Sequence, residues 1–147
     1  SALMGSAGPV LILPDETQLE KIDHVVLGWD ASGEARRGAR DLLQIAEPGA
    51  RIDIVAVDSE PSSEGHSASA GADIARHLSR HGFVTEVHLE SSDGKTVAEA
   101  LEQFAIDQGA NLLSIGAFAH SRIRDILLGG VTRHLLDDAR LPVLLSR

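Results

Sequence analysis

Five short apolar runs alternate along the chain with segments in which apolar residues recur every three or four positions. The runs cover residues 24–28, 51–57, 83–89, 111–116 and 141–146, and Gly, Pro or Asp stands near their borders. Their length and their content of Val, Ile and Leu are typical of buried β-strands. Strands that alternate with helices form a parallel sheet joined by right-handed crossovers. The pattern therefore predicts one α/β domain, in which a five-stranded parallel sheet carries helices on both faces.

Four apolar stripes between these runs have helical spacing. Their members are Ala35, Ala39, Leu42, Leu43 and Ala46; Ile74, Ala75 and Leu78; Val97, Ala98, Leu101, Phe104 and Ala105; and Leu127, Leu128, Val131, Leu135 and Leu136. Ser32 and Asp93 are candidate helix starts. Gly82 and Gly109 are candidate helix stops. The Ser-, Gly- and Ala-rich segment 59–72 predicts a mobile loop before the second helix.

The expected order of the strands in the sheet is 3-2-1-4-5, counted along the chain. In this order the strands 24–28 and 111–116 lie side by side, and the crossovers leave them in opposite directions. Ligands of open parallel sheets bind at the carboxyl ends of the strands at such a switch point. The loops after Gly28 and Gly116 are therefore the candidate site.

The composition disfavours several classes of function. The formal net charge of −9 disfavours binding to nucleic acid and to an anionic membrane surface. The chain has no cysteine, which excludes a disulfide framework, a thiolate metal site and a Cys nucleophile. No apolar run reaches the length of a membrane-spanning helix and no signal-peptide pattern is present, so a cytoplasmic location is expected.

The seven histidines form no recognisable metal or catalytic group in the sequence. His77 and His81 stand four residues apart on one helix face, but no acidic third ligand accompanies them, so a solvated face is favoured. His120 lies in the loop after Gly116 without an acid to orient it. The remaining four have no assignable partner: His24, His66, His88 and His134.

The segment 116–132 contains a candidate phosphate site at the start of the last predicted helix. Backbone N–H groups at a helix start are unpaired, and together with the helix dipole they favour an anion. Gly129 and Gly130 would let a phosphate approach the backbone, and Thr132 would add a hydroxyl donor. Charge could come from Arg122 and Arg124. The glycines alone favour a simple turn into the helix, and it is their place at the switch point that favours a phosphate.

Trp29 and Asp30 follow the first strand. Asp30 could accept hydrogen bonds from ribose hydroxyls or hold a cation beside phosphates, and it could equally be a helix N-cap or a turn residue. Trp29 is expected in the core or in an interface rather than as a stacking platform.

From His24 to the end, these segments resemble the universal stress protein family. Its members typically carry Asp-x-Ser after the first strand, matched here by Asp30-Ala31-Ser32. They typically end with Gly, two residues, Gly, nine residues and Gly-Ser or Gly-Thr, followed by a helix and a Pro-Val strand. Gly116, Gly129 and Pro142-Val143 match this closing segment. The resemblance implies a Rossmann-like, adenine-nucleotide-binding architecture.

Two positions depart from the family pattern. Ala119 stands at the usual second glycine, and Gly130 stands at the usual Ser or Thr. Gly130 lacks the hydroxyl that would donate to a phosphate. Losing one such charge-assisted hydrogen bond typically costs about 1.5–3 kcal/mol, or roughly ten- to a hundredfold in affinity. The resemblance thus implies a degenerate site for ATP or AMP, with Mg²⁺ only when ATP is bound. Some members of the family bind no ATP.

By the same resemblance, adenine would lie near Val57 and Ile115. Ribose would lie near Asp30 and Gly116, and phosphates near residues 129–132. The full set of candidate nucleotide-binding residues is Asp30, Ala31, Ser32, Val57, Ile115, Gly116, Phe118, Ala119, His120, Arg122, Gly129, Gly130, Val131 and Thr132. No catalytic residue and no metal ligand is assigned.

A short repeat links the two ends of the chain. Residues 9–13, with the sequence PVLIL, match residues 142–146, with the sequence PVLLS. This match predicts that residues 1–23 are the tail of a preceding copy of the domain plus a linker, the other interpretation being a tag, and that residues 24–147 are the domain itself. The family pairs its last strands antiparallel, between copies or within tandem chains. Residues 9–13 are therefore expected to pair with residues 143–146 as an extra antiparallel edge strand.

Three functions are compatible with these features. The first is a stress-response regulatory module that binds an adenine nucleotide weakly. The second is a structural or protein-interaction domain with a worn nucleotide site, which dimerises through its last strand. The third, a slow ATPase, has the least support, because no residue is placed to activate water and the P-loop lysine pattern is absent.

Overall fold

The computed structural model describes residues 9–30, 33–58, 66–116 and 138–146. Its strands and helices, in chain order, are β1 (Val10–Ile12), β2 (His24–Gly28), α2 (Gly33–Ile45), β3 (Arg51–Val57), α3 (His66–Arg80), β4 (Val84–Glu90), α4 (Val97–Gln108), β5 (Leu112–Gly116) and β6 (Val143–Ser146). All five predicted strands are present, and their bounds differ from the prediction by no more than two residues.

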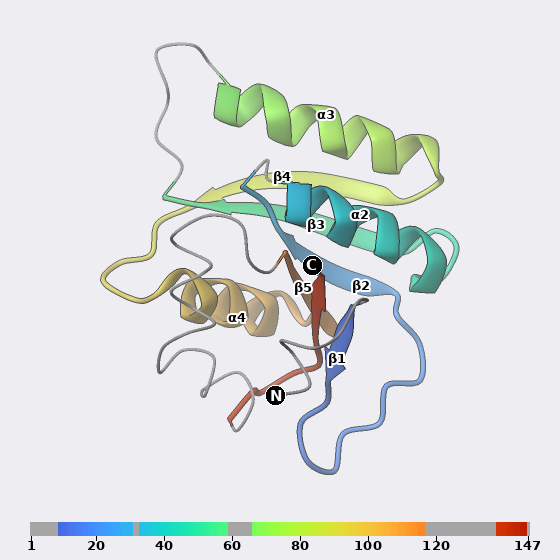
Figure 1. Ribbon diagram of the computed structural model, residues 1–147, viewed down its shortest axis with the longest axis vertical. Coiled ribbons are helices and arrows are strands. Elements are labelled where there is room, and N and C mark those ends of the chain that lie inside the picture. Colours follow the sequence, from blue (N-terminus) through green and yellow to red (C-terminus); the bar gives the residue numbers. More distant parts are fainter. Residues whose placement is uncertain (1–8, 31–32, 59–65, 117–137, 147) are drawn as a thin grey trace.

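The strands form a single sheet in the order β1-β6-β5-β2-β3-β4 (Figure 1). Strands β6, β5, β2, β3 and β4 pair in parallel, and β1 pairs antiparallel with β6. The five parallel strands thus follow the predicted order 3-2-1-4-5, read from the opposite edge. The sheet itself has six strands rather than five, because β1 is added beside β6.

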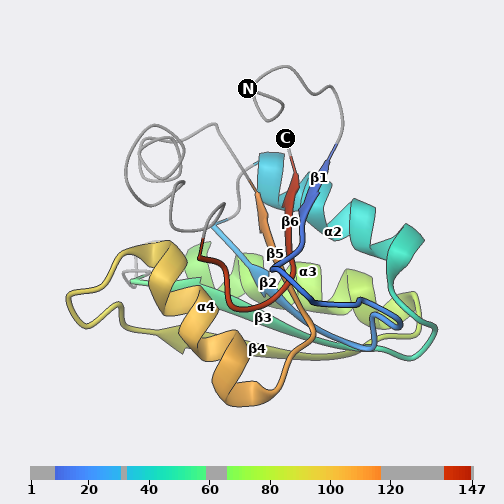
Figure 2. The ribbon, with the colours of Figure 1, turned by 90° about the horizontal axis from the view of Figure 1, so that it is seen from below.

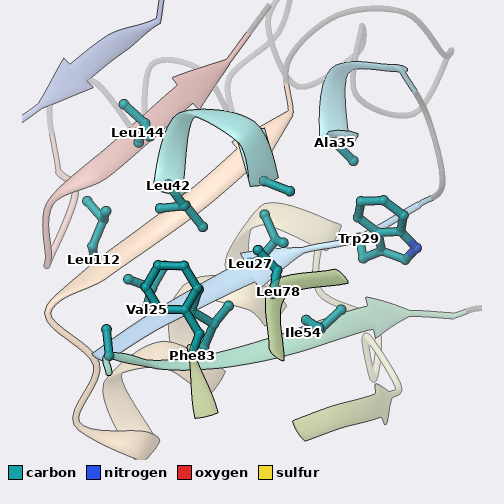
Figure 3. Packing of buried hydrophobic residues seen from close by; sticks show 13 residues of the cluster. Val25, Leu27, Trp29, Ala35, Leu42, Ile54, Leu78, Phe83, Leu112 and Leu144 are labelled. Atoms are coloured by element: carbon teal, nitrogen blue, oxygen red, sulfur yellow. The ribbon is translucent and has the colours of Figure 1, made fainter. Parts of the chain in front are cut away.

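Helices α2 and α3 lie on one face of the sheet, and α4 lies on the other (Figure 1, Figure 2). Successive strand residues point to opposite faces, so the central strands carry apolar side chains on both. The cluster under α2 and α3 includes Val25, Leu27, Leu42, Ile52, Ile54, Leu78, Phe83 and Leu112 (Figure 3). The cluster against α4 includes Val26, Val55, Leu101, Ala105, Leu113, Ile115, Val143 and Leu145. The sheet is therefore the middle layer between two apolar cores.

Helix α4 is capped at both ends. Thr96 is the N-cap, and its Oγ1 accepts a hydrogen bond of 3.1 Å from the backbone N–H of Glu99. Gly109 closes the helix in the left-handed conformation, at φ 74°, as the sequence predicts. The predicted start at Asp93 is wrong, because Asp93 has φ 50° and belongs to the turn before the helix.

The second helix begins earlier than the sequence predicts. The sequence predicts a loop over residues 59–72, but α3 begins at His66. Ala is the best helix former and Ser is only mildly unfavourable, so this Ser- and Ala-rich segment is compatible with a helix. Among the described residues, no helix combines the length and the apolarity that crossing a membrane requires.

Strand β1 confirms the antiparallel edge strand that the N-terminal repeat predicts. The opposing pairs are Val10 with Leu145, Leu11 with Leu144, and Ile12 with Val143. Ile12 is buried and Val10 is half-buried against the α4 side of the core, whereas Leu11 is 45% exposed. The edge of β6 is therefore covered by the chain's own N-terminal segment.

Candidate functional site

The carboxyl ends of β2 and β5 lie side by side near the centre of the sheet. Leu27 lies opposite Ser114 in the last register position of this parallel pair. The strand that follows β2 in the chain lies on one side, and the strand that follows β5 lies on the other. This arrangement is the topological switch point that the sequence predicts, and it is where ligands of open parallel sheets bind.

Four of the predicted site residues are described, and all belong to this edge of the sheet. Asp30 lies two residues beyond the end of β2 and is exposed. Val57 ends β3 and is half-buried. Ile115 and Gly116 end β5 and are buried. The ends of three neighbouring strands thus carry one carboxylate, two apolar side chains and one glycine.

The segment that leads to Asp30 is fixed at two points. The backbone N–H of Trp29 donates a hydrogen bond of 2.8 Å to the carbonyl of Val55, which continues the contact between β2 and β3. Gly28 packs closely on α4, because a Cβ built there would lie 2.8 Å from Cδ1 of Leu101. Gly28 is not among the predicted site residues, and a glycine at the end of a buried strand is the signal for such a close approach.

The other predicted residues lie outside the described residues. They are Ala31, Ser32, Phe118, Ala119, His120, Arg122, Gly129, Gly130, Val131 and Thr132. Arg124 and the fourth apolar stripe also lie there. The phosphate part of the candidate site therefore stays a prediction from the sequence.

A buried carboxylate on β3 is surrounded by three basic side chains. Asp53 is fully buried, and its Oδ2 lies 2.8 Å from Nε2 of His24. Its Oδ1 lies 2.9 Å from Nε2 of His88. Arg51 donates to both oxygens, at 3.2 and 3.0 Å, and its Nη2 also donates to Glu86 at 2.7 Å. The parallel register brings these residues together from β2, β3 and β4.

The surroundings of Asp53 keep its carboxylate ionised. Burial alone would raise the pKa of this carboxyl group, because it penalises the charged form. Hydrogen bonds from Arg51, His24 and His88 outweigh burial, so the pKa lies below its usual value. The pKa of Arg51 is raised, chiefly by its hydrogen bond to Asp53. The network therefore holds a charged group inside the sheet.

Asp53, Glu86 and His88 are the one group among the described residues with the composition and spacing of a metal site. However, Nη2 of Arg51 lies 3.0 Å from Oδ1 of Asp53 and 2.7 Å from Oε2 of Glu86. A cationic guanidinium thus occupies the position between the two carboxylates, and a metal ion would have to displace it. We therefore interpret the group as an ion-pair network that joins three strands.

The predictions for the histidines have different outcomes. His77 and His81 do share one face, because their rings meet edge to face with centroids 4.9 Å apart. His24 and His88, which have no assignable partner in the sequence, both contact Asp53. The signal for this contact is the charged residue inside an otherwise apolar strand, since a buried charge needs a partner.

A family model described as the universal stress protein family matches residues 21–147. The universal stress protein Slr1230 from Synechocystis is 28% identical over 143 residues, which cover 95% of this chain and 47% of that protein. The chain thus spans about half the length of this curated relative.

Two solved structures have the same fold. A universal stress protein family member from Burkholderia pseudomallei is 25% identical, with a TM-score of 0.63, and the match covers 84% of this chain and 95% of that one. A universal stress protein in complex with cAMP is 23% identical, with a TM-score of 0.65, and the match covers 87% of this chain and 98% of that one.

Proposed function

The chain belongs to the universal stress protein family, and we propose that residues 24–147 form a regulatory module that binds an adenine nucleotide. The observation that carries this proposal is the placement of Asp30, Val57 and Gly116 at the carboxyl ends of β2, β3 and β5. These ends meet at the switch point of the sheet. The universal stress protein in complex with cAMP supports an adenine nucleotide as the class of ligand.

Each of these positions suits a different part of a nucleotide. Val57 and Ile115 offer apolar contacts to the adenine ring. The exposed carboxylate of Asp30 would accept hydrogen bonds from ribose hydroxyls. Gly116 has no side chain, so the ribose can come close to the backbone there. In this proposal the phosphates belong at residues 129–132, where the sequence matches the closing segment of the family.

We expect ATP or AMP to bind weakly. Gly130 lacks the hydroxyl that the family uses near the phosphates, and the loss of that one hydrogen bond would cost roughly ten- to a hundredfold in affinity. Ala119 adds a methyl group where the family usually has a glycine. Mg²⁺ would accompany ATP rather than AMP, because oxygens of neighbouring phosphates chelate the ion and AMP has a single phosphate. We do not propose rapid hydrolysis, because the P-loop lysine pattern is absent from the sequence.

Titration calorimetry with ATP, ADP, AMP and cAMP tests this function. Asp30→Ala should weaken binding about tenfold, because it removes the acceptor of charge-assisted hydrogen bonds. Asp15→Ala is the matched control, since Asp15 is an exposed aspartate in the connection from β1 to β2, at the opposite end of the sheet. No binding of any of the four nucleotides at about 10 mM, or equal losses in both variants, would contradict the proposal.

We also propose a role in domain pairing, which rests on strand β1. Its antiparallel pairing with β6 and the repeat of residues 142–146 in residues 9–13 both fit the last strand of a preceding domain. Residues 1–14 would be the tail of that domain, and residues 15–23 would be the linker. Because the Synechocystis relative is about twice as long as its matched part, it has room for such a second domain. This role does not require a bound nucleotide.

A further inference from the structure

A groove with a cavity volume of about 410 Å³ is lined by residues of α2 and α3 together with Trp29. The two helices lie on the face of the sheet opposite α4 (Figure 1). That volume is in the range of binding sites for small organic molecules. The apolar part of its lining consists of Trp29, Ala39, Leu43 and Ile74. Since Trp29 and Ala39 are buried while Leu43 and Ile74 are half-buried, the groove offers a partly enclosed apolar surface.

The indole of Trp29 brings an unsatisfied hydrogen-bond donor to this groove. Trp29 lines the groove and is only 8% exposed. Its Nε1 is buried and has no hydrogen-bond partner within the described part of the chain. Figure 3 shows the indole nitrogen on the side of the ring turned away from Leu27. Buried Trp N–H groups usually have an acceptor. Because this nitrogen has almost no accessible surface, a ligand acceptor would reach it after a small shift of the side chains around the indole.

Two arginines bring positive charge to the same groove. Arg36 and Arg40 stand one turn apart on α2, are exposed and line the groove. Neither forms an ion pair with another described residue. Like charges at this spacing are unfavourable in a helix, and Arg36 in the first turn also opposes the helix dipole. In a chain with a net charge of −9, this local concentration of positive charge favours an anionic ligand.

We propose that this groove binds a small amphipathic carboxylate. Its apolar body would lie over Leu43 and Ile74, and its carboxylate would accept hydrogen bonds from Trp29, Arg36 and Arg40. A carboxylate has two oxygens with about four acceptor positions, which is enough for three donors. The groove shares no residue with the candidate nucleotide site, so this proposal is independent of the proposed function.

The remaining polar side chains limit the ligand to one acidic group. Asp73 lines the groove, but its side chain is 75% exposed and lies 3.6 Å from Arg76 of the same helix. His77 lines the groove as well and is exposed. Asp73 would repel a second acidic group at its side of the groove, so a monocarboxylate is favoured over a dicarboxylate.

The fluorescence of Trp29 gives a direct readout. Trp29 is the only Trp in the chain, and there is no Tyr, so the emission reports on this groove. Octanoate and its neutral analogue octanamide are suitable probes, because they differ only in the polar group. We expect octanoate to change the emission at about 1–10 mM, the range for a ligand of this size. Octanamide should bind about tenfold more weakly, since a neutral amide forms no ion pair with the two arginines.

Substitutions separate this site from unspecific binding. Arg36→Gln and Arg40→Gln should each weaken octanoate binding about tenfold. Arg37→Gln is the matched control, because Arg37 is exposed on the same helix but does not line the groove, and it should leave the affinity unchanged. Trp29→Phe keeps an aromatic ring but removes the N–H, so calorimetry should show weaker binding of octanoate.

Several results would overturn the assignment. Equal affinities for octanoate and octanamide would show that the anionic group is not recognised. Equal losses in Arg36→Gln and Arg37→Gln would show that binding follows net charge rather than the groove. No change in Trp29 emission while calorimetry detects binding would place the ligand elsewhere, and no binding of octanoate at all would remove the site.

Discussion

Ser146 of β6 donates a hydrogen bond of 2.7 Å from its Oγ to Oδ2 of Asp41 in α2. Ser114 on the neighbouring strand β5 is equally buried, yet its Oγ has no hydrogen-bond partner within the described part of the chain. Both hydroxyls lie close under the helix, because a Cβ built on Gly38 would be 3.3 Å from one and 3.6 Å from the other. The two serines therefore form a matched pair that differs in one hydrogen bond.

Alanine substitutions of the two serines should have different effects on stability. Ser146→Ala should lower the free energy of unfolding by about 1 kcal/mol, because the bond to Asp41 is lost. Ser114→Ala should leave it unchanged or raise it by up to about 1 kcal/mol, because an unpaired buried hydroxyl is removed. Urea denaturation measures both changes. Equal destabilisation by the two substitutions would show that Ser114 has a partner after all.

The network around Asp53 should contribute to stability through its carboxylate. Asp53→Asn should lower the free energy of unfolding by about 2 kcal/mol, because a neutral amide cannot accept from three basic side chains at once. Glu86→Gln removes the exposed ion pair of Arg51 and should cost about 0–1 kcal/mol. Urea denaturation at neutral pH compares the two variants, and a larger loss for Glu86→Gln would contradict this account of the network.

The lowered pKa of Asp53 predicts a stability that depends on pH. In the unfolded chain this carboxyl group has its ordinary pKa of about 3.9, so between that value and the lower folded pKa the unfolded state binds more protons. The stabilisation is fully present above about pH 5 and is lost as the pH falls through the folded pKa. The stability difference between the natural chain and Asp53→Asn should shrink over that range in urea denaturation. A difference that stays constant at acidic pH would refute the prediction.

The order of the parallel strands could be predicted because the pattern of strands and helices allows few topologies. Apolar runs bounded by turn residues identify the strands, and their alternation with helices leaves few topologies that avoid crossed or left-handed connections. The pairing of β1 with β6 was predictable for a different reason, since residues 9–13 repeat residues 142–146. The positions of Asp30 and Gly116 at the switch point follow from the strand order.

The ion-pair network could not be predicted, because it depends on the register between strands that are distant in the sequence. Asp53 stands inside an apolar run and signals a buried charge, but His24 and His88 are 29 and 35 residues away.

The residue at which α4 starts could not be predicted from the sequence either. Asp93 and Thr96 are both suitable N-cap residues, and the turn that follows β4 decides for Thr96.

Removing residues 1–14 should turn the covered edge of β6 into a dimer interface. Without β1, the outer backbone groups of β6 lose their partners, and Val143 and Leu145 lose their contacts with the N-terminal strand. An exposed apolar edge strand readily pairs with another strand. Two truncated chains can satisfy both edges by pairing β6 antiparallel across a twofold axis. Analytical ultracentrifugation should therefore show a dimer that depends on protein concentration.

Two controls connect this dimer to the missing strand. Leu11→Lys in the untruncated chain changes an exposed side chain and keeps the backbone pairing of β1. It should therefore have the same oligomeric state as the untruncated chain without the substitution. A synthetic peptide of residues 1–14 should dissociate the dimer of the truncated chain, because it restores the edge strand by β-augmentation. A truncated chain that is folded by circular dichroism and stays monomeric at high concentration would show that β1 does not stand in for the last strand of a paired domain.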